Sequence, residues 1–445
     1  MPKMLGEGGR GPYQAYNPGK EIICMHVLKS GLPAILGGER AVTLDQEQAN
    51  RWPVITPQDE QAVLKILRDG DISTHPVIRE LEEDYRAFTG MPYALAHCNG
   101  TAALLASFFA LDLQPGDEVL VPSATFWASV LPMMWLGIVP VFCESEDERL
   151  GLDPHDMEKR ITPRTRAAVI VHLWGMPSKM TEILAICERH NLKIIEDASH
   201  AQGATWRDRM CGTLGDVTVF SLQGGKLAPA GEGGIFLCRN YQYYERAICL
   251  GDITRIIELE TAARRFAATS YGIKTRIAPV SAAIARGQLA RLDENNRRRN
   301  DNLEYLSRHL ENMGFDTFLP PPHIKRVYFE FIIRIRKDEV KLPVPILVKA
   351  LQAEGCKASL PRYPLLHQQP FFTEGAFLRI MRPEKGMPQP QYLPQALPRI
   401  EESGDTLLSL PSFPNATREL LDQYVQAFEK VLHHSNNIAA KCSET

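Results

Sequence analysis

Short apolar runs alternate with longer amphipathic stretches through most of the chain. The runs are rich in β-branched residues and are bounded by turn residues, which is the pattern of buried strands. Strands and helices that alternate in this way predict a mainly parallel sheet with helices on both faces. A hairpin return before the last run predicts one antiparallel strand. The predicted strands are a short one that begins at residue 93, then 118–122, 139–143, 167–173, 193–195, 217–220 and 235–238.

The helical patterns have recognisable start and stop residues. Thr56 suits an N-cap, Pro57 fits the first helical position and Gly70 ends the first helix. Beyond the sheet region, the pattern predicts a long linking helix, one strand, a long loop and a closing helix, which together form a smaller α+β domain. Further predicted elements are helices at 75–89, 179–191, 281–310, near 345–354 and at 418–433, a strand at 327–335 and a loop at 360–405.

These patterns predict two domains between two irregular ends. We expect an N-terminal extension at residues 1–35, a large sheet domain at 36–295, a small C-terminal domain at 296–433 and a flexible tail at 434–445.

Three polar side chains come directly after two of the predicted strands. Asp197 follows the strand at 193–195, Ser221 follows the strand at 217–220, and Lys226 comes five residues later in a glycine-rich turn. Ligands of open α/β sheets bind beyond the carboxyl ends of the strands, so we expect one shared pocket. Pyridoxal phosphate needs a lysine for a Schiff base, an acid near its pyridine nitrogen and a hydroxyl near its phosphate. Taken singly, these residues could be a solvated lysine, a helix cap and a turn serine.

Two other features could serve the same cofactor. Gly100 and Thr101 open a predicted helix, and the positive end of a helix dipole suits a phosphate. A simple threonine cap explains the same residues. Phe126 follows the strand at 118–122 and could stack on a flat ring, although a place in the core is the alternative.

Composition and charge exclude several classes of protein. The 445 residues are 44% hydrophobic and 23% charged with a net charge of −3, so neither nucleic acid nor an anionic membrane is an expected partner. The nine cysteines form no C-x-x-C pair and no regular spacing, which indicates reduced thiols in a cytoplasmic protein and no metal-ligand pattern. The longest apolar stretch, 130–143, is too short to span a membrane.

Seven segments of the chain together are typical of one known family. These landmarks are NGTAAL (99–104), TFWAS (125–129), EDASHAQGA (196–204), FSLQGGK (220–226) followed by GEGG (231–234), AAIARGQLARLDE (282–294), RYPLLHQQP (362–370) and LPSFPNAT (410–417). Through them the chain resembles the DegT/DnrJ/EryC1/StrS aminotransferases, which use pyridoxal phosphate to aminate keto-sugars and keto-cyclitols. The resemblance covers most of residues 30–430.

The resemblance implies a fold and a set of roles. It implies the fold type I architecture of pyridoxal phosphate enzymes and a homodimer whose subunits share their active sites. Lys226 would bind the cofactor covalently, Asp197 would contact its pyridine nitrogen and Phe126 would stack on its ring. The phosphate would be held by Gly100, Thr101 and Ser221.

Three departures from the family pattern bear on the chemistry. Many members have glutamine where His200 stands, near the phenolic oxygen of the cofactor, so the charge of the histidine would affect the ring. Many have asparagine where Lys274 stands, in a segment that reaches into the neighbouring subunit's site. The landmark at 220–226 lacks the threonine that is common just before the lysine, where Gly225 stands here. Its SLQ opening is similar to the SMQ form of cyclitol aminotransferases, which favours a keto-cyclitol such as an inosose.

We therefore expect an aminotransferase that moves an amino group from glutamine or glutamate to a keto-cyclitol or keto-sugar by ping-pong kinetics. Two alternatives remain open on the sequence. One is an elimination or cyclisation enzyme on the same fold, and the other is a non-catalytic regulator that binds pyridoxal phosphate. A P-loop enzyme is excluded because Lys226 is followed by Leu227 and not by serine or threonine.

Overall fold

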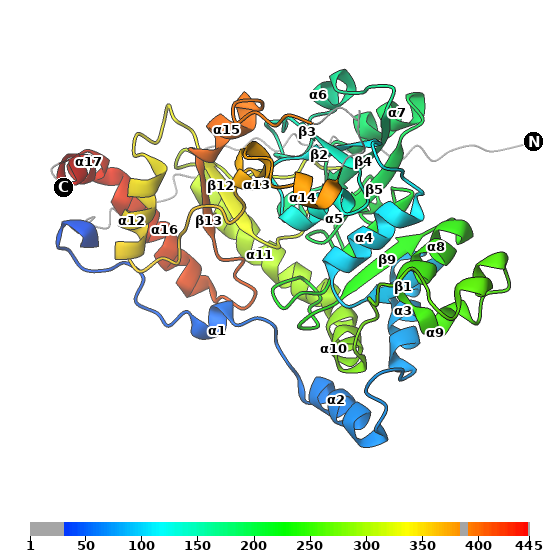
Figure 1. Cartoon of the computed structure of the whole chain (residues 1–445). Helices are drawn as coiled ribbons and strands as arrows, with labels where there is room; N and C mark the ends of the chain where they lie inside the picture. The colour runs from blue at the N-terminus through cyan, green and yellow to red at the C-terminus, as the bar shows by residue number, and fades with distance from the viewer. Residues whose placement is uncertain (1–30, 383–389, 444–445) are drawn as a thin grey trace, which may run out of the picture.

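A seven-stranded sheet forms the centre of the larger of two lobes (Figure 1). The computed structural model describes residues 31–382 and 390–443. The strand order is β1-β9-β8-β5-β4-β2-β3, and β9 alone in this sheet runs antiparallel to its neighbours. The predicted α/β class, with a mainly parallel sheet, is confirmed. The strands are β1 (Tyr93–His97), β2 (Glu118–Pro122), β3 (Val139–Cys143), β4 (Thr165–Val171), β5 (Lys193–Asp197), β8 (Val217–Ser221) and β9 (Gly234–Cys238).

Helices cover both faces of this sheet because successive strand residues point to opposite sides. In β1, Leu95 joins a core cluster with helices α4 and α8, whereas Ala94 and Ala96 join a second cluster with α3 and α10. The helices of this lobe are α2 (Pro57–Asp69), α3 (Val77–Thr89), α4 (Gly100–Ala110), α5 (Leu131–Met134), α6 (Pro154–Lys159), α7 (Met180–Arg189), α8 (Tyr241–Gly251), α9 (Ile253–Ile256) and α10 (Pro279–Ala290), with 3-10 turns η2 (Trp127–Ser129), η3 (Leu173–Gly175) and η4 (Ala262–Phe266).

Helix α2 begins and ends at the residues that the sequence predicts. The Thr56 hydroxyl accepts a hydrogen bond from the Asp59 N–H at 3.3 Å, and the Asp59 carboxylate accepts one from the Thr56 N–H at 2.8 Å. This reciprocal pair satisfies two of the N–H groups that a helix leaves unpaired at its start. Gly70 ends the helix with a φ of +80°, which glycine adopts without strain.

The single long helix predicted at 281–310 is wrong, because the structure has two helices there. Arg291 separates α10 from α11 (Leu292–Glu311), and its φ of −105° and ψ of 3° depart from helical values. The Arg291 guanidinium pairs with the buried Asp59 carboxylate at 2.6 Å, so a contact with α2 accompanies the break. The apolar spacing continues across this one residue, which is why the sequence pattern does not show it.

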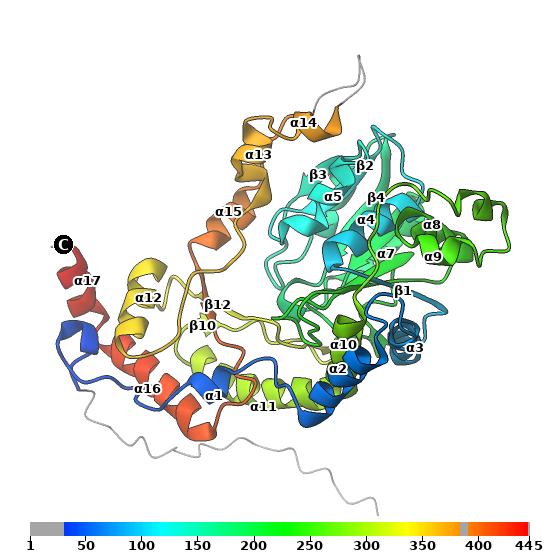
Figure 2. The ribbon, with the colours of Figure 1, turned by 60° about the horizontal axis from the view of Figure 1, so that its bottom comes forward.

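The smaller lobe is an α+β unit around a three-stranded antiparallel sheet (Figure 2). Helix α11 leads into it from the larger lobe, and three helices bury one apolar core with the sheet. The predicted closing helix has the expected bounds. The elements are β10 (Phe315–Asp316), β12 (Phe331–Ile335), α12 (Val344–Ala353), β13 (Leu407–Leu410) and α16 (Arg418–His433); a third small sheet joins β6 (Thr205–Trp206), β7 (Arg209–Met210) and β11 (Ile324–Lys325).

Segments from both ends of the chain complete the smaller lobe. Residues 34–50 contain η1 (Ala34–Leu36) and α1 (Glu47–Asn50), and they bury Val42 and Ala49 in the core of this lobe, although the sequence pattern assigns residues from 36 to the large domain. The tail is also different from the prediction, since residues 435–443 form helix α17 (Ser435–Ser443) with Ile438 buried. Most of the predicted N-terminal extension, residues 1–30, lies outside the described residues. The remaining domain boundaries stay a prediction.

Two segments after α11 differ from their predicted structure. The strand predicted at 327–335 begins only at Phe331, because the N–H groups of Val327 and Phe329 donate to the carbonyl oxygens of Gly175 and Trp174 at 3.2 and 3.4 Å. The described parts of the predicted loop, residues 360–382 and 390–405, contain four short helical segments, which are η5 (Leu366–Gln368), α13 (Pro370–Thr373), α14 (Leu378–Met381) and α15 (Pro398–Gly404).

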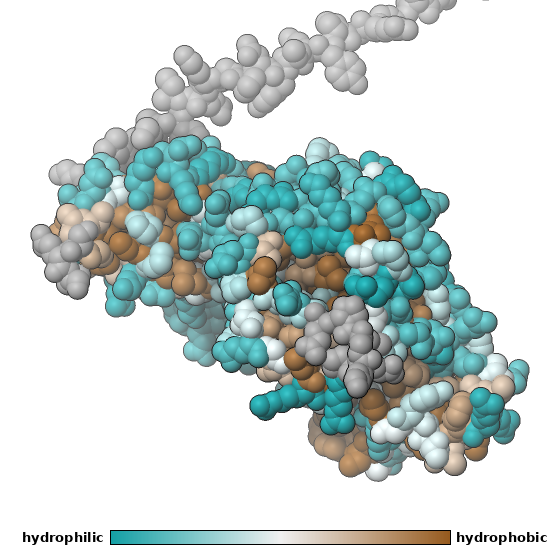
Figure 3. Space-filling view, turned by 45° about the horizontal axis from the view of Figure 1, so that its top comes forward, coloured by the Kyte–Doolittle hydropathy of each residue, from teal (hydrophilic) through white to brown (hydrophobic). Residues whose placement is uncertain are grey.

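The visible surface on the side of these turns is mostly hydrophilic, and apolar residues gather around a hollow near the middle of the view (Figure 3). Within residues 31–382 and 390–443, no helix combines the length and the apolar content needed to cross a bilayer.

Candidate active site

A cavity of about 490 Å³ lies at the carboxyl ends of β5 and β8. Ligand pockets of enzymes have volumes of roughly 300–1,000 Å³, so a cofactor-sized molecule fits. The cavity brings together residues that are more than one hundred positions apart in the sequence. Of the predicted site residues, those that line it are Gly100, Thr101, Phe126, Asp197, His200, Ser221 and Lys226.

Lys226 is a buried amine at the wall of this cavity. Its side chain follows β8 after a tight glycine-containing turn, and its Nζ lies 4.1 Å from the centroid of the Phe329 ring. Burial lowers the pKa of Lys226 to about 8, although the charges of Asp197 and Glu330 act in the opposite direction. The Trp52 indole N–H donates to the Lys226 carbonyl oxygen at 2.8 Å and fixes the backbone. The amine is therefore ready to act as a nucleophile near neutral pH.

Asp197 is the last residue of β5 and is 5% exposed. Its Oδ2 accepts a hydrogen bond from the Ser129 hydroxyl at 2.7 Å, and its Oδ1 accepts one from the Ser199 N–H at 3.1 Å. These two donors fix the orientation of the carboxylate. The residue therefore offers a fixed negative charge to a protonated ring nitrogen in the cavity.

The predicted phosphate site lies where the start of α4 meets the end of β8. Asn99 caps α4, because its side-chain oxygen accepts the Ala102 N–H at 2.8 Å. A Cβ atom placed on Gly100 would lie 3.0 Å from the Cβ and 3.2 Å from the Oγ of Ser221, so a larger residue would fit only if Ser221 shifted by a few tenths of an ångström. The same site excludes a side chain at Gly234, whose Cβ would lie 2.4 Å from the Asn99 carbonyl oxygen. Free N–H groups at the start of α4 and one hydroxyl thus fit a phosphate group.

His200 is buried between two aromatic rings. Its ring centroid lies 4.2 Å from that of Phe329 and 5.7 Å from that of Tyr363, with nearly parallel planes. The Trp174 N–H donates to His200 Nδ1 at 3.3 Å, so Nε2 carries the proton and faces the Tyr363 hydroxyl at 3.3 Å. Burial, together with the positive charges of Lys226 and Arg362, holds the pKa of His200 well below its usual value. The histidine is neutral here and can donate from Nε2.

The last two predicted site residues have different positions. Phe126 lines the cavity and is 41% exposed, with its ring centroid 6.1 Å from that of Tyr363. Lys274 does not line the cavity and is exposed in the loop before α10. Its predicted role in a neighbouring subunit's site stays a prediction.

Sequence reasoning did not assign several residues of this cavity. Phe329 lines this cavity and its neighbour Glu330 lines an adjacent one. Both lie just before β12 in the segment that bonds to η3, where the pattern of apolar positions predicts a strand. Arg362 lies in a recognised landmark but without a role. Its Nε pairs with Glu330 Oε1 at 3.0 Å, while its side chain is 64% exposed. Burial raises the pKa of Glu330, and the charges of Arg362 and Lys226 oppose that shift. Arg362 thus adds an exposed cation to the lining of the cavity that holds Lys226.

A cluster of His172, Glu196 and Cys211 lies behind Asp197 with its ligand atoms within 4.8 Å of one another. Glu196 already accepts hydrogen bonds from the N–H groups of Gly212 at 2.6 Å and Leu214 at 2.8 Å, and it also meets His172 Nε2 at 2.8 Å. The remaining ring nitrogen of His172 accepts the Ser178 N–H at 3.1 Å. These groups are occupied by the protein, so the cluster anchors β5 and does not need a metal.

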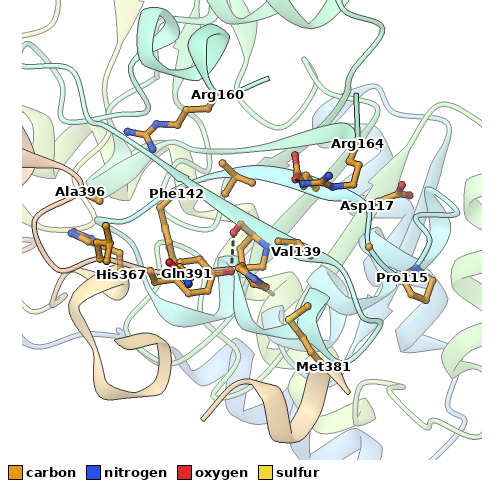
Figure 4. A pocket seen from close by; sticks show the side chains of 17 residues that line it. Pro115, Asp117, Val139, Phe142, Arg160, Arg164, His367, Met381, Gln391 and Ala396 are labelled. Carbon is orange, nitrogen blue, oxygen red and sulfur yellow. Dashed lines mark hydrogen bonds and ion pairs between the residues drawn. The ribbon is translucent and has the colours of Figure 1, made fainter. Parts of the chain in front are cut away.

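A separate cavity of about 470 Å³ runs along the edge strand β3 (Figure 4). Phe142, Arg160 and His367 line it, and the Tyr392 hydroxyl donates to the Pro140 carbonyl oxygen at 3.0 Å within it. None of the predicted site residues lines this cavity. The chemistry therefore belongs to the cavity around Lys226.

The sheet topology and the buried lysine opposite a carboxylate define a fold type I enzyme that depends on pyridoxal phosphate. The model of the DegT/DnrJ/EryC1/StrS aminotransferase family matches residues 53–429, and the chain belongs to that family. The predictions of the family, the cofactor and an aminotransferase activity are confirmed.

Two named relatives and a solved structure are similar to the chain over most of its length. A Micromonospora echinospora protein with the provisional name L-glutamine:3-amino-2,3-dideoxy-scyllo-inosose aminotransferase is 30% identical over 76% of this chain and 82% of its own length. The spore coat polysaccharide biosynthesis protein SpsC of Bacillus subtilis is 26% identical over 85% of this chain and 96% of its own. The crystal structure of DesI, determined in the presence of its TDP-sugar product, superimposes with a TM-score of 0.77 at 25% identity and covers 92% of this chain and 98% of its own.

Proposed function

We propose that this aminotransferase moves an amino group from glutamine or glutamate to a keto-cyclitol or keto-sugar in two half-reactions at one site. The observation that carries the proposal is the buried Lys226 amine with its lowered pKa. The same cavity is lined by Asp197 and by the predicted phosphate site at Gly100 and Ser221. The Micromonospora echinospora relative is named for glutamine and an inosose, and DesI for a TDP-sugar. The SLQ segment favours the cyclitol.

Pyridoxal phosphate, when bound, supplies an electron sink that stabilises negative charge on the carbon next to the transferred nitrogen. Asp197 keeps a proton on the pyridine nitrogen, since an adjacent carboxylate favours the charged form of a base. Gly100, Thr101 and Ser221 bind the phosphate. His200 donates a hydrogen bond from Nε2 to the phenolic oxygen of the cofactor, and Phe126 stacks on one face of the cofactor ring.

Lys226 acts as the acid and base of both half-reactions. The Lys226 amine lies at the wall of the cavity and, when not bonded to the cofactor, could take a proton from one carbon and give it to another. A pKa of about 8 suits this work, because both the neutral and the charged forms of the amine are populated near neutral pH.

Arg362 binds the carboxylate of the amino donor in this proposal. It lines the cavity beside Lys226, and the contact to Glu330 that joins the two side chains at 3.0 Å is made by Nε. The outer guanidinium nitrogens can therefore face a carboxylate in the bidentate geometry that arginine prefers.

Product analysis tests the proposal against an elimination or cyclisation reaction. The enzyme is incubated with a keto-cyclitol or a keto-sugar, with and without L-glutamine or L-glutamate. Transamination consumes the donor and releases its keto acid in an amount equal to the new amine. Consumption of a substrate without any donor would contradict the proposal and would favour elimination.

A homodimer with shared active sites is part of the proposal. The exposed Lys274 would then reach the phosphate site of the neighbouring subunit. Light scattering of the purified protein gives the oligomeric state, and Lys274→Ala should weaken cofactor binding without separating the subunits. The cytoplasmic location predicted from the scattered cysteines stays a prediction.

A further inference from the structure

A second cavity, of about 390 Å³, lies beside the one around Lys226. Phe329 and Arg362 line both cavities and form the wall between them. The second cavity is bounded by Trp52 and Leu227 from the larger lobe, and by residues just before β12, after α12, and in and after β13 of the smaller lobe. It therefore lies at the junction of the lobes and is one side chain away from the catalytic lysine.

The charge that lines this second cavity is positive. Arg299, Lys357 and Arg362 contribute cations, whereas Glu330 is its one acidic lining residue and already pairs with Arg362 at 3.0 Å. Two cations are left without an acidic partner among the described residues that line the cavity.

Arg299 is the unusual member of this group, because it is only 2% exposed. Its Nε and Nη1 atoms have no hydrogen-bond acceptor in the described part of the chain. One face of the guanidinium lies on the Trp52 ring, 3.9 Å from its centroid. Burial and the charge of Arg298 lower the pKa of Arg299 to about 9. A buried charge whose donors have no acceptor is destabilising, and the cation–π contact with Trp52 offsets only part of that destabilisation.

We propose that this second cavity binds a phosphate-type oxyanion between Arg299 and Lys357. A tetrahedral oxyanion offers several acceptor oxygens and can meet donors from different directions, including the hydroxyls of Ser359, Ser409 and Ser412 that line the same cavity. The site goes beyond the proposed transamination, for which no anion besides the cofactor phosphate and the donor carboxylate is needed.

The site is coupled to the chemistry through Trp52. The indole ring lies against Arg299, and the indole N–H donates to the Lys226 carbonyl oxygen. The oxyanion is either the phosphate group of an acceptor that extends past Phe329 or a separate ligand.

Calorimetric titration of the holoenzyme with inorganic phosphate tests the site. The enzyme is first saturated with pyridoxal phosphate, so that the turn at Gly100 and Ser221 is filled, and the buffer contains no other oxyanion. We expect one phosphate per protomer. Arg299→Met should weaken its affinity at least about tenfold, as expected for a charged hydrogen-bond partner. Lys357→Gln, at an exposed position, should weaken it roughly two- to fivefold.

Lys349→Gln makes the same charge change on the exposed surface of α12, away from the cavity, and should leave phosphate affinity unchanged. If Arg299→Met fails to fold, as judged by circular dichroism, Lys357→Gln carries the test alone. Equal phosphate affinity in the unmodified enzyme, Arg299→Met and Lys357→Gln, or no saturable binding in the millimolar range, would overturn the site.

Steady-state kinetics then separate the two sources of the oxyanion. Phosphate that competes with the acceptor indicates that the acceptor carries the anionic group, whereas noncompetitive behaviour indicates a separate ligand. Both results support the site. Because the titration contains no donor and no acceptor, its failure leaves the proposed transamination untouched.

Discussion

The close approach of Gly100 and Ser221 allows the cofactor cradle, which is the predicted phosphate site formed by Gly100, Thr101 and Ser221, to be tested by adding one methyl group. In Gly100→Ala the new Cβ would lie 3.0 Å from the Cβ and 3.2 Å from the Oγ of Ser221. Carbon atoms prefer separations of about 3.5–4.0 Å, so Ser221 and the start of α4 must move apart by several tenths of an ångström. Overpacking of this kind costs about 1–3 kcal/mol. Since both groups are expected to hold the phosphate, cofactor affinity should fall roughly 10- to 100-fold.

Titration of the apoenzyme with pyridoxal phosphate measures that affinity. Gly404→Ala is the matched control, because no atom lies within 4 Å of its added Cβ, and it should bind normally. Ser221→Gly removes the crowded side chain, so Gly100→Ala should cost much less in that background than alone. An equal cost in both backgrounds, or an unchanged affinity in Gly100→Ala, would refute the cradle.

Three further predictions concern the chemistry of the same cavity. Lys226→Ala should abolish turnover and retain the cofactor only without a covalent bond, as measured by activity assay and by dialysis against an amine-free buffer. The rate at which the apoenzyme captures pyridoxal phosphate should rise with pH and reach half its maximum near pH 8. The reason is that only the neutral amine reacts, and burial lowers the pKa of Lys226 to about 8 from its ordinary 10.5. Stopped-flow absorbance measures this rate. Arg362→Gln should raise the donor KM roughly 10- to 100-fold with cofactor affinity unchanged, since a charged hydrogen-bond partner of the carboxylate is lost.

Different results would contradict each of these predictions. Retained turnover in Lys226→Ala would end the assignment of the lysine. A capture rate that is half-maximal near pH 10 would show that the amine is not desolvated. An unchanged donor KM in Arg362→Gln would remove that residue from donor binding, and an equal loss of cofactor affinity would indicate a merely structural role.

The sheet and the residues at its strand ends were predictable from local patterns. The strands β2 and β3 have the predicted bounds, and β5 and β8 extend by one or two residues to include Asp197 and Ser221 themselves. Parallel strands place their carboxyl ends at one edge, so the convergence of these residues with Lys226 followed from topology alone.

What the sequence could not show depends on contacts between distant segments. The pattern at 327–335 predicts a continuous strand, but Val327 and Phe329 donate to η3 of the larger lobe, and Phe329 lines the cavity around Lys226. The break at Arg291 accompanies an ion pair with Asp59, more than two hundred residues away. Helix α17 is too short for its few apolar positions to reveal a period, and its place is set by burial of Ile438.

The absorbance spectrum of the purified protein, before and after addition of L-glutamine or L-glutamate, tests the central claim most directly. We expect a visible absorbance band from the cofactor joined to Lys226, and we expect this band to convert to a near-ultraviolet band when the donor transfers its amino group. That one result would establish the cofactor, the lysine linkage and the donor half-reaction together. A protein that shows no visible band even after reconstitution with pyridoxal phosphate would contradict the account.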